Sequence, residues 1–407
     1  MRLRIHHGAA EIGGNCVELQ SGQSRLLLDL GLPLKAGTHD LPDVPGLTDA
    51  NPDLLGVVLS HPHLDHYGLL PLALRTIPVW LGEGACRLLE AAAPFTRSST
   101  LPQTVSPYRG GQPFVVGPFG ITPYLMDHSA YDSHALLVEA HGRRLFYSGD
   151  FRGHGRKAAV FERFLKHPPR DIDLLLMEGT TLGRDEAGIS EKGVEDEAHA
   201  IMRATAGAVF ACFSGQNIDR FVTFLRASMR AGRTFVVDAY MANLVSGLGL
   251  SSLPQMEDHP AIRVYLSKNQ KRMILESKRF DLIDRYRGRR IYAEEIIARP
   301  AAFTMMFRSS MAGDPGAADP RGGSLIYSLW PGYLERDRID LREWARERGV
   351  EFHIVHSSGH ANREDLVRMV RAIAPGRLMP IHTEHPARYA QLFERVQCAQ
   401  NGEWVAV

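Results

Sequence analysis

The chain has 407 residues, of which 44% are hydrophobic and 23% are charged, and its formal net charge at pH 7 is +1. This length is sufficient for two domains, or for one large domain that carries an insertion, and the composition predicts a sizeable core. The near-zero net charge excludes a strongly basic chain, so any binding to nucleic acid must depend on a local patch.

The sequence lacks the usual signs of membrane insertion or secretion. No stretch approaches about 18 uncharged apolar residues, and no apolar segment follows the polar start at residues 1–7. The four cysteines are scattered singly, without C-x-x-C spacing, at Cys16, Cys86, Cys212 and Cys398. We therefore expect reduced, mostly buried thiols in a cytoplasmic protein with no membrane partner.

The first 150 residues are rich in short strand patterns. These predicted strands lie at residues 2–6, 16–19, 25–30, 54–59, 135–140 and 144–148. Gly and Pro residues separate them, as in a packed pair of sheets. Helical patterns at residues 68–75, 86–93 and 157–166 predict helices on the outside of the strands, and hence a mixed α/β architecture.

From about residue 190 helices and strands alternate. A helix at 194–204, a strand at 208–213, a helix at 218–230 and a strand at 234–238 predict a second sheet, with parallel strands. Residues 312–323 are rich in Gly, Pro and Asp and predict a mobile loop. After this loop we expect a strand, a helix at 341–348, a strand at 351–356, a helix at 363–373 and a strand at 378–381.

The string His61-Pro62-His63-Leu64-Asp65-His66 directly follows the predicted strand 54–59. Neutral imidazole and carboxylate are good zinc ligands, and this spacing can aim His61 and His63 at one ion and Asp65 and His66 at a second. Two ions about 3.5 to 4 Å apart can activate a water molecule for hydrolysis of a phosphodiester or an acyl bond. The alternative is a polar turn with solvated histidines, which the fixed spacing disfavours.

Further candidate ligands stand at the ends of other apolar runs. We interpret His128 as a third imidazole for the first ion, and Asp150 as a carboxylate that can bridge both ions. His382 follows the predicted strand 378–381, although the neighbouring His385 is an alternative. Asp29 also ends a strand, and we expect it to orient a ligand histidine rather than bind an ion itself.

Taken together, these motifs resemble a known family. Asp29, the string at 61–66, His128 and Asp150 look like the successive motifs of the metallo-β-lactamase fold. Three further residues, Glu178, His360 and His382, resemble the extra motifs of the β-CASP nucleases. Within that group the chain is most similar to ribonuclease J, because residues 356–361 fit its H-x-S-G-H-A segment and residues 11–15 resemble the opening of its first domain.

The resemblance implies a metallo-β-lactamase αββα sandwich at residues 1–189, an inserted α/β β-CASP domain at 190–349 and a return to the first domain at 350–407. It also implies two divalent ions, Zn²⁺ or alternatively Mn²⁺. His61, His63 and His128 would bind one ion, Asp65, His66 and His382 would bind the other, and Asp150 would bridge them. Asp65, Glu178 and His360 would be the catalytic residues, with His360 protonating the leaving oxygen and Glu178 positioning it.

The family resemblance also points to single-stranded RNA as the substrate, since family members with histidine at the last motif, here His382, mostly act on RNA. His356, Ser358 and Gly359 would help to bind a 5′-terminal phosphate. Residues 213–220, with Ser214 and Asn217, only loosely resemble the phosphate-contacting turn of the family.

A basic segment at residues 268–290 has nine Lys and Arg residues against three acidic ones. Lys268, Lys271 and Arg272 lie at its start, and Phe280 and Tyr286 are interleaved with the charges. Such a mixture can bind phosphates and stack bases, although a solvated helix face is an equal alternative.

We therefore expect a dinuclear ribonuclease of ribonuclease J type, acting as a 5′-to-3′ exonuclease, an endonuclease or both. The alternatives are an exonuclease for single-stranded DNA, a small-molecule metallo-hydrolase acting on a thioester or lactone, and an inactive RNA-binding subunit. The sequence departs from ribonuclease J at His382-Thr383, where glycine usually follows the histidine, and its end at Val407 predicts a short form without the C-terminal domain. Whether the protein forms a homodimer stays an open question.

Overall fold

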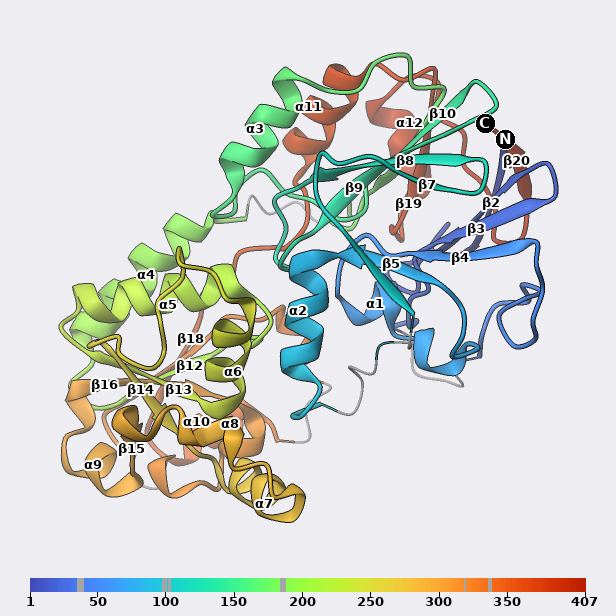
Figure 1. Ribbon diagram of the computed structural model, residues 1–407. Helices are drawn as coiled ribbons and strands as arrows, with labels where there is room; N and C mark the ends of the chain where they lie inside the picture. Colours follow the sequence, from blue (N-terminus) through green and yellow to red (C-terminus); the bar gives the residue numbers. More distant parts are fainter. Residues whose placement is uncertain (35–39, 97–100, 102–103, 184–187, 318–319, 336–338) are drawn as a thin grey trace. The chain divides into compact units, whose positions relative to one another are not determined.

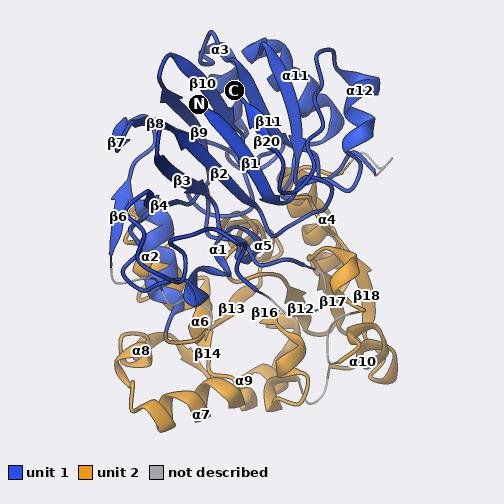
Figure 2. Cartoon of the chain, turned by 90° about the vertical axis from the view of Figure 1, so that its right-hand side faces the viewer, with its two compact units in different colours: residues 1–93, 97–187, 359–407 blue, residues 94–96, 188–358 orange. Residues whose placement is uncertain are grey.

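The computed structural model describes residues 1–34, 40–96, 101, 104–183, 188–317, 320–335 and 339–407 (Figure 1). The chain forms two compact units (Figure 2). Unit 1 comprises residues 1–93, 97–187 and 359–407, and unit 2 comprises residues 94–96 and 188–358. None of the described helices is both long and apolar enough to cross a bilayer.

Unit 1 contains two sheets. The first has the order β20-β1-β2-β3-β4-β5-β6, with β20 (Trp404–Ala406), β1 (Arg2–His7), β2 (Cys16–Ser21), β3 (Ser24–Leu28), β4 (Leu54–Val58), β5 (Val79–Gly82) and β6 (Val105–Tyr108). The second has the order β19-β11-β10-β9-β8-β7, with β19 (Arg377–Ile381), β11 (Leu174–Glu178), β10 (Arg143–Tyr147), β9 (His134–Ala140), β8 (Phe119–Leu125) and β7 (Phe114–Val116).

The two sheets of unit 1 pack face to face, and helices cover their outer sides. The helices are α1 (Leu64–Tyr67), α2 (Glu83–Ala92), α3 (Ala158–Lys166), α11 (Arg363–Ile373) and α12 (Tyr389–Leu392). Successive strand residues point to opposite faces, so Leu145 joins the core between the sheets while Phe146 joins a separate core with Phe161 of α3 and Leu366 of α11. The strand β11 is apolar from Leu174 to Met177 because both of its faces are buried. The predicted αββα sandwich is confirmed.

Unit 2 contains one sheet of seven parallel strands, as the alternating pattern predicted. Its order is β15-β14-β13-β16-β12-β17-β18, with β15 (Arg290–Ile291), β14 (Ile262–Tyr265), β13 (Thr234–Asp238), β16 (Phe303–Phe307), β12 (Val209–Cys212), β17 (Ser324–Tyr327) and β18 (Glu351–Ile354). The helices are α4 (Glu191–Ala204), α5 (Ile218–Arg230), α6 (Ala239–Leu248), α7 (Lys268–Ser277), α8 (Asp281–Asp284), α9 (Ala293–Ala298) and α10 (Leu341–Glu347). Because β18 pairs with β17, unit 2 extends to residue 358 instead of 349.

Two local predictions are wrong. The helix expected at residues 68–75 is replaced by α1, which ends at Tyr67, and by a single 3₁₀ turn at Leu70–Leu72. Pro71 lies in this turn, lacks an N–H and disfavours helical geometry at the residue before it. The expected mobile loop at 312–323 is instead partly packed, because a 3₁₀ turn at Pro315–Ala317 buries Ala317. Residues 318–319 of that prediction lie outside the described residues.

Candidate metal centre

The histidine string begins three residues after β4 and continues into the short helix α1. Backbone hydrogen bonds fix this turn against the opposite segment: the Asn15 N–H donates to the Asp65 carbonyl (3.0 Å) and the Leu30 N–H donates to the His66 carbonyl (2.8 Å). Gly31 allows this approach, since a Cβ there would lie 1.8 Å from the Asp65 carbonyl oxygen. The local backbone therefore holds Asp65 and His66 in place.

The other predicted ligands also follow strands of unit 1. His128 comes three residues after β8, Asp150 three residues after β10, and His382 directly after β19. His382 has a positive φ of 54°, which is uncommon for a residue other than glycine. The ends of three separate strands thus place these side chains next to the histidine string at residues 61–66.

All seven predicted ligands lie together. The ligand atoms of His61, His63 and His128 fall within 4.8 Å of one another, and the same holds for Asp65, His66 and His382. Asp150 lies at the centre of the cluster. Its Oδ2 is 3.2 Å from Nε2 of His66, 3.6 Å from Nε2 of His61, and 3.9 Å from Nε2 of both His128 and His382.

Several polar atoms of this cluster are buried without a hydrogen-bond partner. Within the described part of the chain, these atoms are Nε2 of His61, His66 and His382 and both carboxylate oxygens of Asp150. Burial of unpaired polar atoms is costly, and native proteins rarely leave such atoms unsatisfied. Imidazole nitrogens around a shared carboxylate form a donor set that suits zinc and related divalent cations. The residues present therefore fit a metal centre.

Three of these histidines have a protein partner at the other ring nitrogen. Nδ1 of His66 bonds Asp29 (2.8 Å), Nδ1 of His382 bonds the Asn15 side chain (2.8 Å), and Nδ1 of His128 bonds the Gly359 carbonyl (2.5 Å). Such bonds fix the ring so that Nε2 can bind a cation. Asp29 was singled out from the sequence, whereas Asn15 was not, although it ends the segment 11–15 that resembles ribonuclease J.

Most of the histidines are held in the neutral form that binds metals. Burial lowers the pKa of His61, His128 and His382, and it lowers the pKa of His63 to about 4. His66 differs. Burial would lower its pKa as well, but the carboxylates of Asp150 and Asp29 outweigh burial and raise the pKa well above its ordinary value. Two carboxylates around one imidazole favour a positive charge at this position, which a cation can supply.

Glu178 and His360 lie beside the cluster. Nδ1 of His360 is 3.1 Å from Oε2 of Glu178 and 3.6 Å from Oδ2 of Asp150. Glu178 is fully buried, while 20% of the His360 side chain is exposed. Burial opposes a charge on His360, but the carboxylates of Glu178 and Asp150 raise its pKa to about 9. Sequence reasoning missed Thr180, whose hydroxyl donates to Oε2 of Glu178 (2.8 Å).

The predicted phosphate-binding residues are divided between the units. Gly359 belongs to unit 1, and a Cβ at this position would lie 2.3 Å from Oγ of Ser129. His356, Ser358, Ser214 and Asn217 belong to unit 2. Within that unit the Asn217 side chain accepts the Arg220 N–H and caps α5, so its oxygen already has a structural role.

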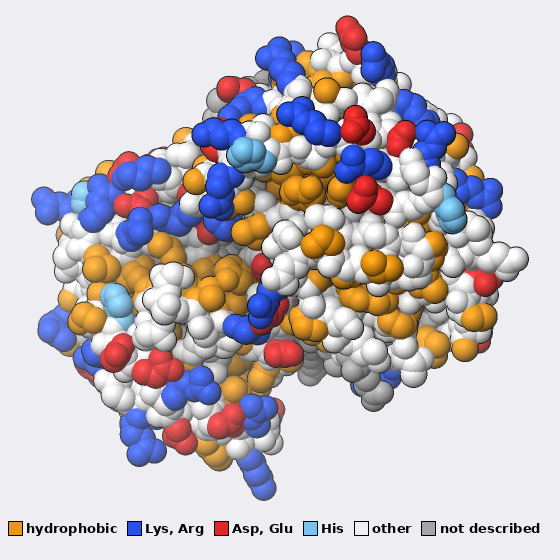
Figure 3. Space-filling view, turned by 45° about the horizontal axis from the view of Figure 1, so that its top comes forward, with side chains coloured by type: hydrophobic (Ala, Val, Ile, Leu, Met, Phe, Trp, Pro, Cys, Tyr) orange, Lys and Arg blue, Asp and Glu red, His pale blue; other side chains and the backbone are white. Residues whose placement is uncertain are grey.

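The basic segment contains α7 and α8, and Lys268, Lys271 and Arg272 lie on α7. One part of the prediction is wrong: Tyr286 is fully buried and cannot stack on a base, whereas 45% of Phe280 is exposed. Arg279 and Arg287 form ion pairs with Asp281 and Asp284 of the same segment, so these two arginines already have acidic partners. On the face drawn in Figure 3, basic and acidic side chains are likewise interspersed.

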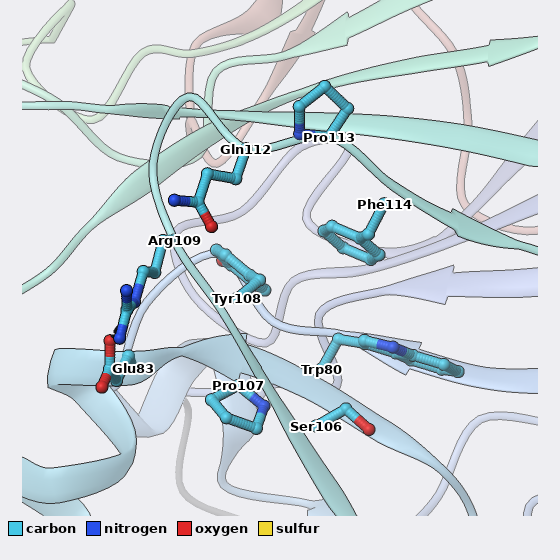
Figure 4. A pocket seen from close by; sticks show the side chains of 9 residues that line it. All are labelled: Trp80, Glu83, Ser106, Pro107, Tyr108, Arg109, Gln112, Pro113 and Phe114. Atoms are coloured by element: carbon cyan, nitrogen blue, oxygen red, sulfur yellow. Dashed lines mark hydrogen bonds and ion pairs between the residues drawn. The ribbon is translucent and has the colours of Figure 1, made fainter.

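A separate pocket of about 490 Å³ in unit 1 contains none of the predicted metal ligands (Figure 4). Trp80 of β5, Tyr108 of β6 and Phe114 of β7 line it, together with residues of the loop that joins β6 and β7. The rings of Tyr108 and Phe114 are stacked, with centroids 5.4 Å apart. The chemistry expected of the histidine cluster therefore lies elsewhere in the unit.

Parts of the chain match two family models, and most of its length is similar to known proteins. Residues 24–214 match the family model described as "Beta-lactamase superfamily domain", and residues 347–397 match "Zn-dependent metallo-hydrolase RNA specificity domain". Ribonuclease J of Sinorhizobium meliloti is 25% identical over 86% of this chain and 62% of its own length. Ribonuclease J of Mycobacterium tuberculosis is 25% identical over 94% of this chain and 68% of its own length.

A solved structure shows the same fold. A protein of unknown function from Enterococcus faecalis V583 covers 100% of this chain, and the chain covers 99% of that protein, with a TM-score of 0.81 at 19% sequence identity. The chain spans about two thirds of the length of the ribonucleases J named above, and 56% of the length of ribonuclease J from Helicobacter pylori.

Proposed function

Because the chain is a ribonuclease J-like protein with a metallo-β-lactamase domain, we propose that it is a metal-dependent ribonuclease that hydrolyses phosphodiester bonds in single-stranded RNA. The observation that carries the proposal is the single carboxylate oxygen of Asp150 that faces four histidine Nε2 atoms, next to the His360–Glu178 pair. Free cysteines, three of them buried, support a reducing, cytoplasmic setting.

We propose that the cluster binds two ions. One would be held by His61, His63 and His128, the other by Asp65, His66 and His382, and Asp150 would contact both. Zinc suits this set of nitrogen and oxygen donors best, and manganese is the alternative. When bound, two such ions activate a water molecule and neutralise the charge of a phosphate.

We assign His360 the role of proton donor to the leaving oxygen. Its Nδ1 is bonded to Glu178, so the ring is oriented and its exposed part can face a substrate. A positioned imidazole of this kind contributes about 10²- to 10⁴-fold to a hydrolysis rate. Glu178 is the positioning residue, since its carboxylate also accepts the backbone N–H groups of Phe151 and Ala361.

We propose that the enzyme degrades RNA from the 5′ end, cuts internally, or does both, with His356, Ser358 and Gly359 contacting a 5′-terminal phosphate. Ser214 and Asn217 are weaker candidates for this contact. The support is the match of residues 347–397 to an RNA specificity domain, which spans these three residues.

The test compares one RNA sequence with a 5′-monophosphate, a 5′-hydroxyl or a 5′-triphosphate, beside single-stranded DNA of the same sequence, each with zinc and with manganese. We expect RNA cleavage, with the 5′-monophosphate preferred if the terminal contact exists. Cleavage of DNA alone would identify a DNA exonuclease. Absence of any RNA cleavage with metal bound would refute the proposal.

Two substitutions separate the roles. Asp65→Asn should abolish cleavage and reduce the bound metal, whereas His360→Asn should abolish cleavage and leave the metal content unchanged. His167→Asn changes an exposed histidine of unit 1 and serves as the matched control. Equal metal loss in the Asp65 and His360 variants would contradict the division between ligand and proton donor.

A further inference from the structure

A continuous line of buried hydrogen bonds connects His382 to His66 through Asn15, Tyr147 and Asp29. Nδ1 of His382 contacts Oδ1 of Asn15 (2.8 Å), and the Asn15 amide donates to the Tyr147 hydroxyl (3.1 Å). The Tyr147 hydroxyl donates to Oδ2 of Asp29 (2.7 Å), which in turn contacts Nδ1 of His66 (2.8 Å). All five residues are at most 1% exposed.

The chemistry of these groups fixes the direction of every bond. The Asp29 carboxylate oxygen accepts, so the Tyr147 hydroxyl hydrogen and the His66 Nδ1 hydrogen both point to it. The Tyr147 oxygen must then accept from Asn15, which turns the amide nitrogen towards Tyr147 and the amide oxygen towards His382. His382 therefore carries its hydrogen on Nδ1, and its Nε2 lone pair is left for a cation.

Asn15 also holds the third ligand of the same proposed ion. The backbone N–H of Asn15 donates to the backbone carbonyl of Asp65 (3.0 Å), and the backbone carbonyl of Asn15 accepts the Gly31 N–H (2.9 Å). The ligands of the other proposed ion are held differently: Nδ1 of His128 bonds the Gly359 carbonyl, and Nδ1 of His61 lies 3.0 Å from a serine hydroxyl. Asn15 therefore contacts ligands of one set only. Asp29 is also linked to His61 through the Ser60 hydroxyl, but that bond to Asp29 (2.8 Å) does not pass through Asn15 or Tyr147.

We propose that Asn15 and Tyr147 are positioning residues that set the tautomer of His382, and that they selectively maintain the affinity for the ion held by Asp65, His66 and His382. The inference rests on the proposed metal centre. Loss of the Tyr147 hydroxyl would leave the Asn15 amide nitrogen without its acceptor and free to turn towards His382. The His382 ring would then carry its hydrogen on Nε2, and a protonated Nε2 has no lone pair with which to bind a cation.

The central experiment uses Tyr147→Phe, which removes one oxygen and keeps the ring. Zinc titration should show two ions in the wild type, and in the variant one ion at wild-type affinity and a second weakened about 10- to 100-fold. Tyr108→Phe is the control, because it removes another buried hydroxyl, one that donates to the Leu59 carbonyl (2.6 Å). It should bind both ions normally.

Nitrogen NMR of metal-free, ¹⁵N-histidine-labelled protein tests the tautomer directly, with the His382 signal assigned by its loss in His382→Gln. We expect the Nδ1–H form in the wild type and the Nε2–H form in Tyr147→Phe. Adding Asn15→Asp to Tyr147→Phe should restore the Nδ1–H form and the second ion, since a carboxylate accepts in either orientation.

An unchanged tautomer and two normal ions in Tyr147→Phe would overturn the proposal, and so would equal weakening of both ions or failure of Asn15→Asp to restore the second. If the wild type binds no zinc, the proposed function fails, while the metal-free NMR measurement still decides whether Tyr147 sets the tautomer of His382.

Discussion

Glu178→Gln tests whether a carboxylate is required beside His360. Every neighbour that bonds this side chain is a donor. Oε1 accepts the N–H groups of Phe151 (3.1 Å) and Ala361 (3.3 Å). Oε2 accepts the N–H (3.3 Å) and hydroxyl (2.8 Å) of Thr180 and faces Nδ1 of His360 (3.1 Å). A carboxylate can accept all of these bonds, whereas an amide cannot.

The magnitude follows from counting bonds. With the glutamine NH₂ group at the Oε2 position, only the Thr180 N–H is an obligate donor, because the Thr180 hydroxyl and a neutral His360 can accept instead. At least one hydrogen bond to a charged, buried acceptor is therefore lost. Each such bond contributes about 1.5–3 kcal/mol, which predicts that Glu178→Gln lowers the free energy of unfolding by at least that amount. His360 also loses the acceptor that orients it, so cleavage by the folded variant should fall at least about 100-fold.

Urea denaturation at pH 7 measures the stability, and RNA cleavage per mole of folded protein measures the activity. Glu139→Gln is the matched control, because Glu139 lies on β9 with 46% of its side chain exposed and pairs with Arg144 at 3.0 Å. An exposed pair of this kind should change the stability by less than about 1 kcal/mol. A Glu178→Gln variant with wild-type stability and cleavage would refute the reasoning.

Stability should depend on pH through Glu18, a buried carboxylate bonded to two arginines and a histidine. Burial alone would raise its pKa, but these partners lower the pKa from 4.5 to about 2. The ionised group therefore contributes about 3 kcal/mol to the free energy of unfolding above pH 4.5, and this contribution is lost as the pH falls towards 2. Glu18→Gln should therefore be less stable in urea at pH 7 and converge with the wild type near pH 2; an equal difference at both pH values would contradict this. Gly31→Ala should reduce the zinc content at the Asp65 site, because the new Cβ would lie 1.8 Å from the Asp65 carbonyl oxygen. Gly120→Ala is the control and should leave the zinc content unchanged, because its Cβ would meet a backbone oxygen only at 3.8 Å. Lys271→Ala should weaken RNA binding and reduce the slope of log affinity against log salt by about 0.7, with cleavage of very short RNA unaffected; an unchanged slope would remove this lysine from the interface.

Much of the fold could be predicted because strand and helix patterns are local. The strand at 234–238 and the helices at 218–230 and 363–373 were predicted with the bounds that the structure shows. Apolar runs with period two, or with both faces apolar, depend on neighbouring residues only. The helix expected at 68–75 failed for a local reason too, since Pro71 lies within it.

The burial of Tyr286 shows where local reasoning ends. Aromatic and basic residues alternate at 268–290, and this pattern is the same for a base-stacking surface and for a helix with one ring in the core. Tyr286 packs inside unit 2 and donates to a serine hydroxyl at 3.1 Å. Tyr286 is buried because of long-range packing, and no short segment of the sequence contains that information.

The sequence by itself identified the candidate ligands, because the string at 61–66 places three imidazoles and one carboxylate at a spacing that a plain turn does not require. Only the tertiary structure decided which other residues support them. Asn15 and His382 are 367 positions apart, and Tyr147 stands at the end of an unremarkable apolar strand, yet the packing of the two sheets brings all three into one line of hydrogen bonds. A polar residue buried by distant strands acquires its partner only from the fold, because the hydrogen bond depends on their positions in space and not on their spacing in the chain.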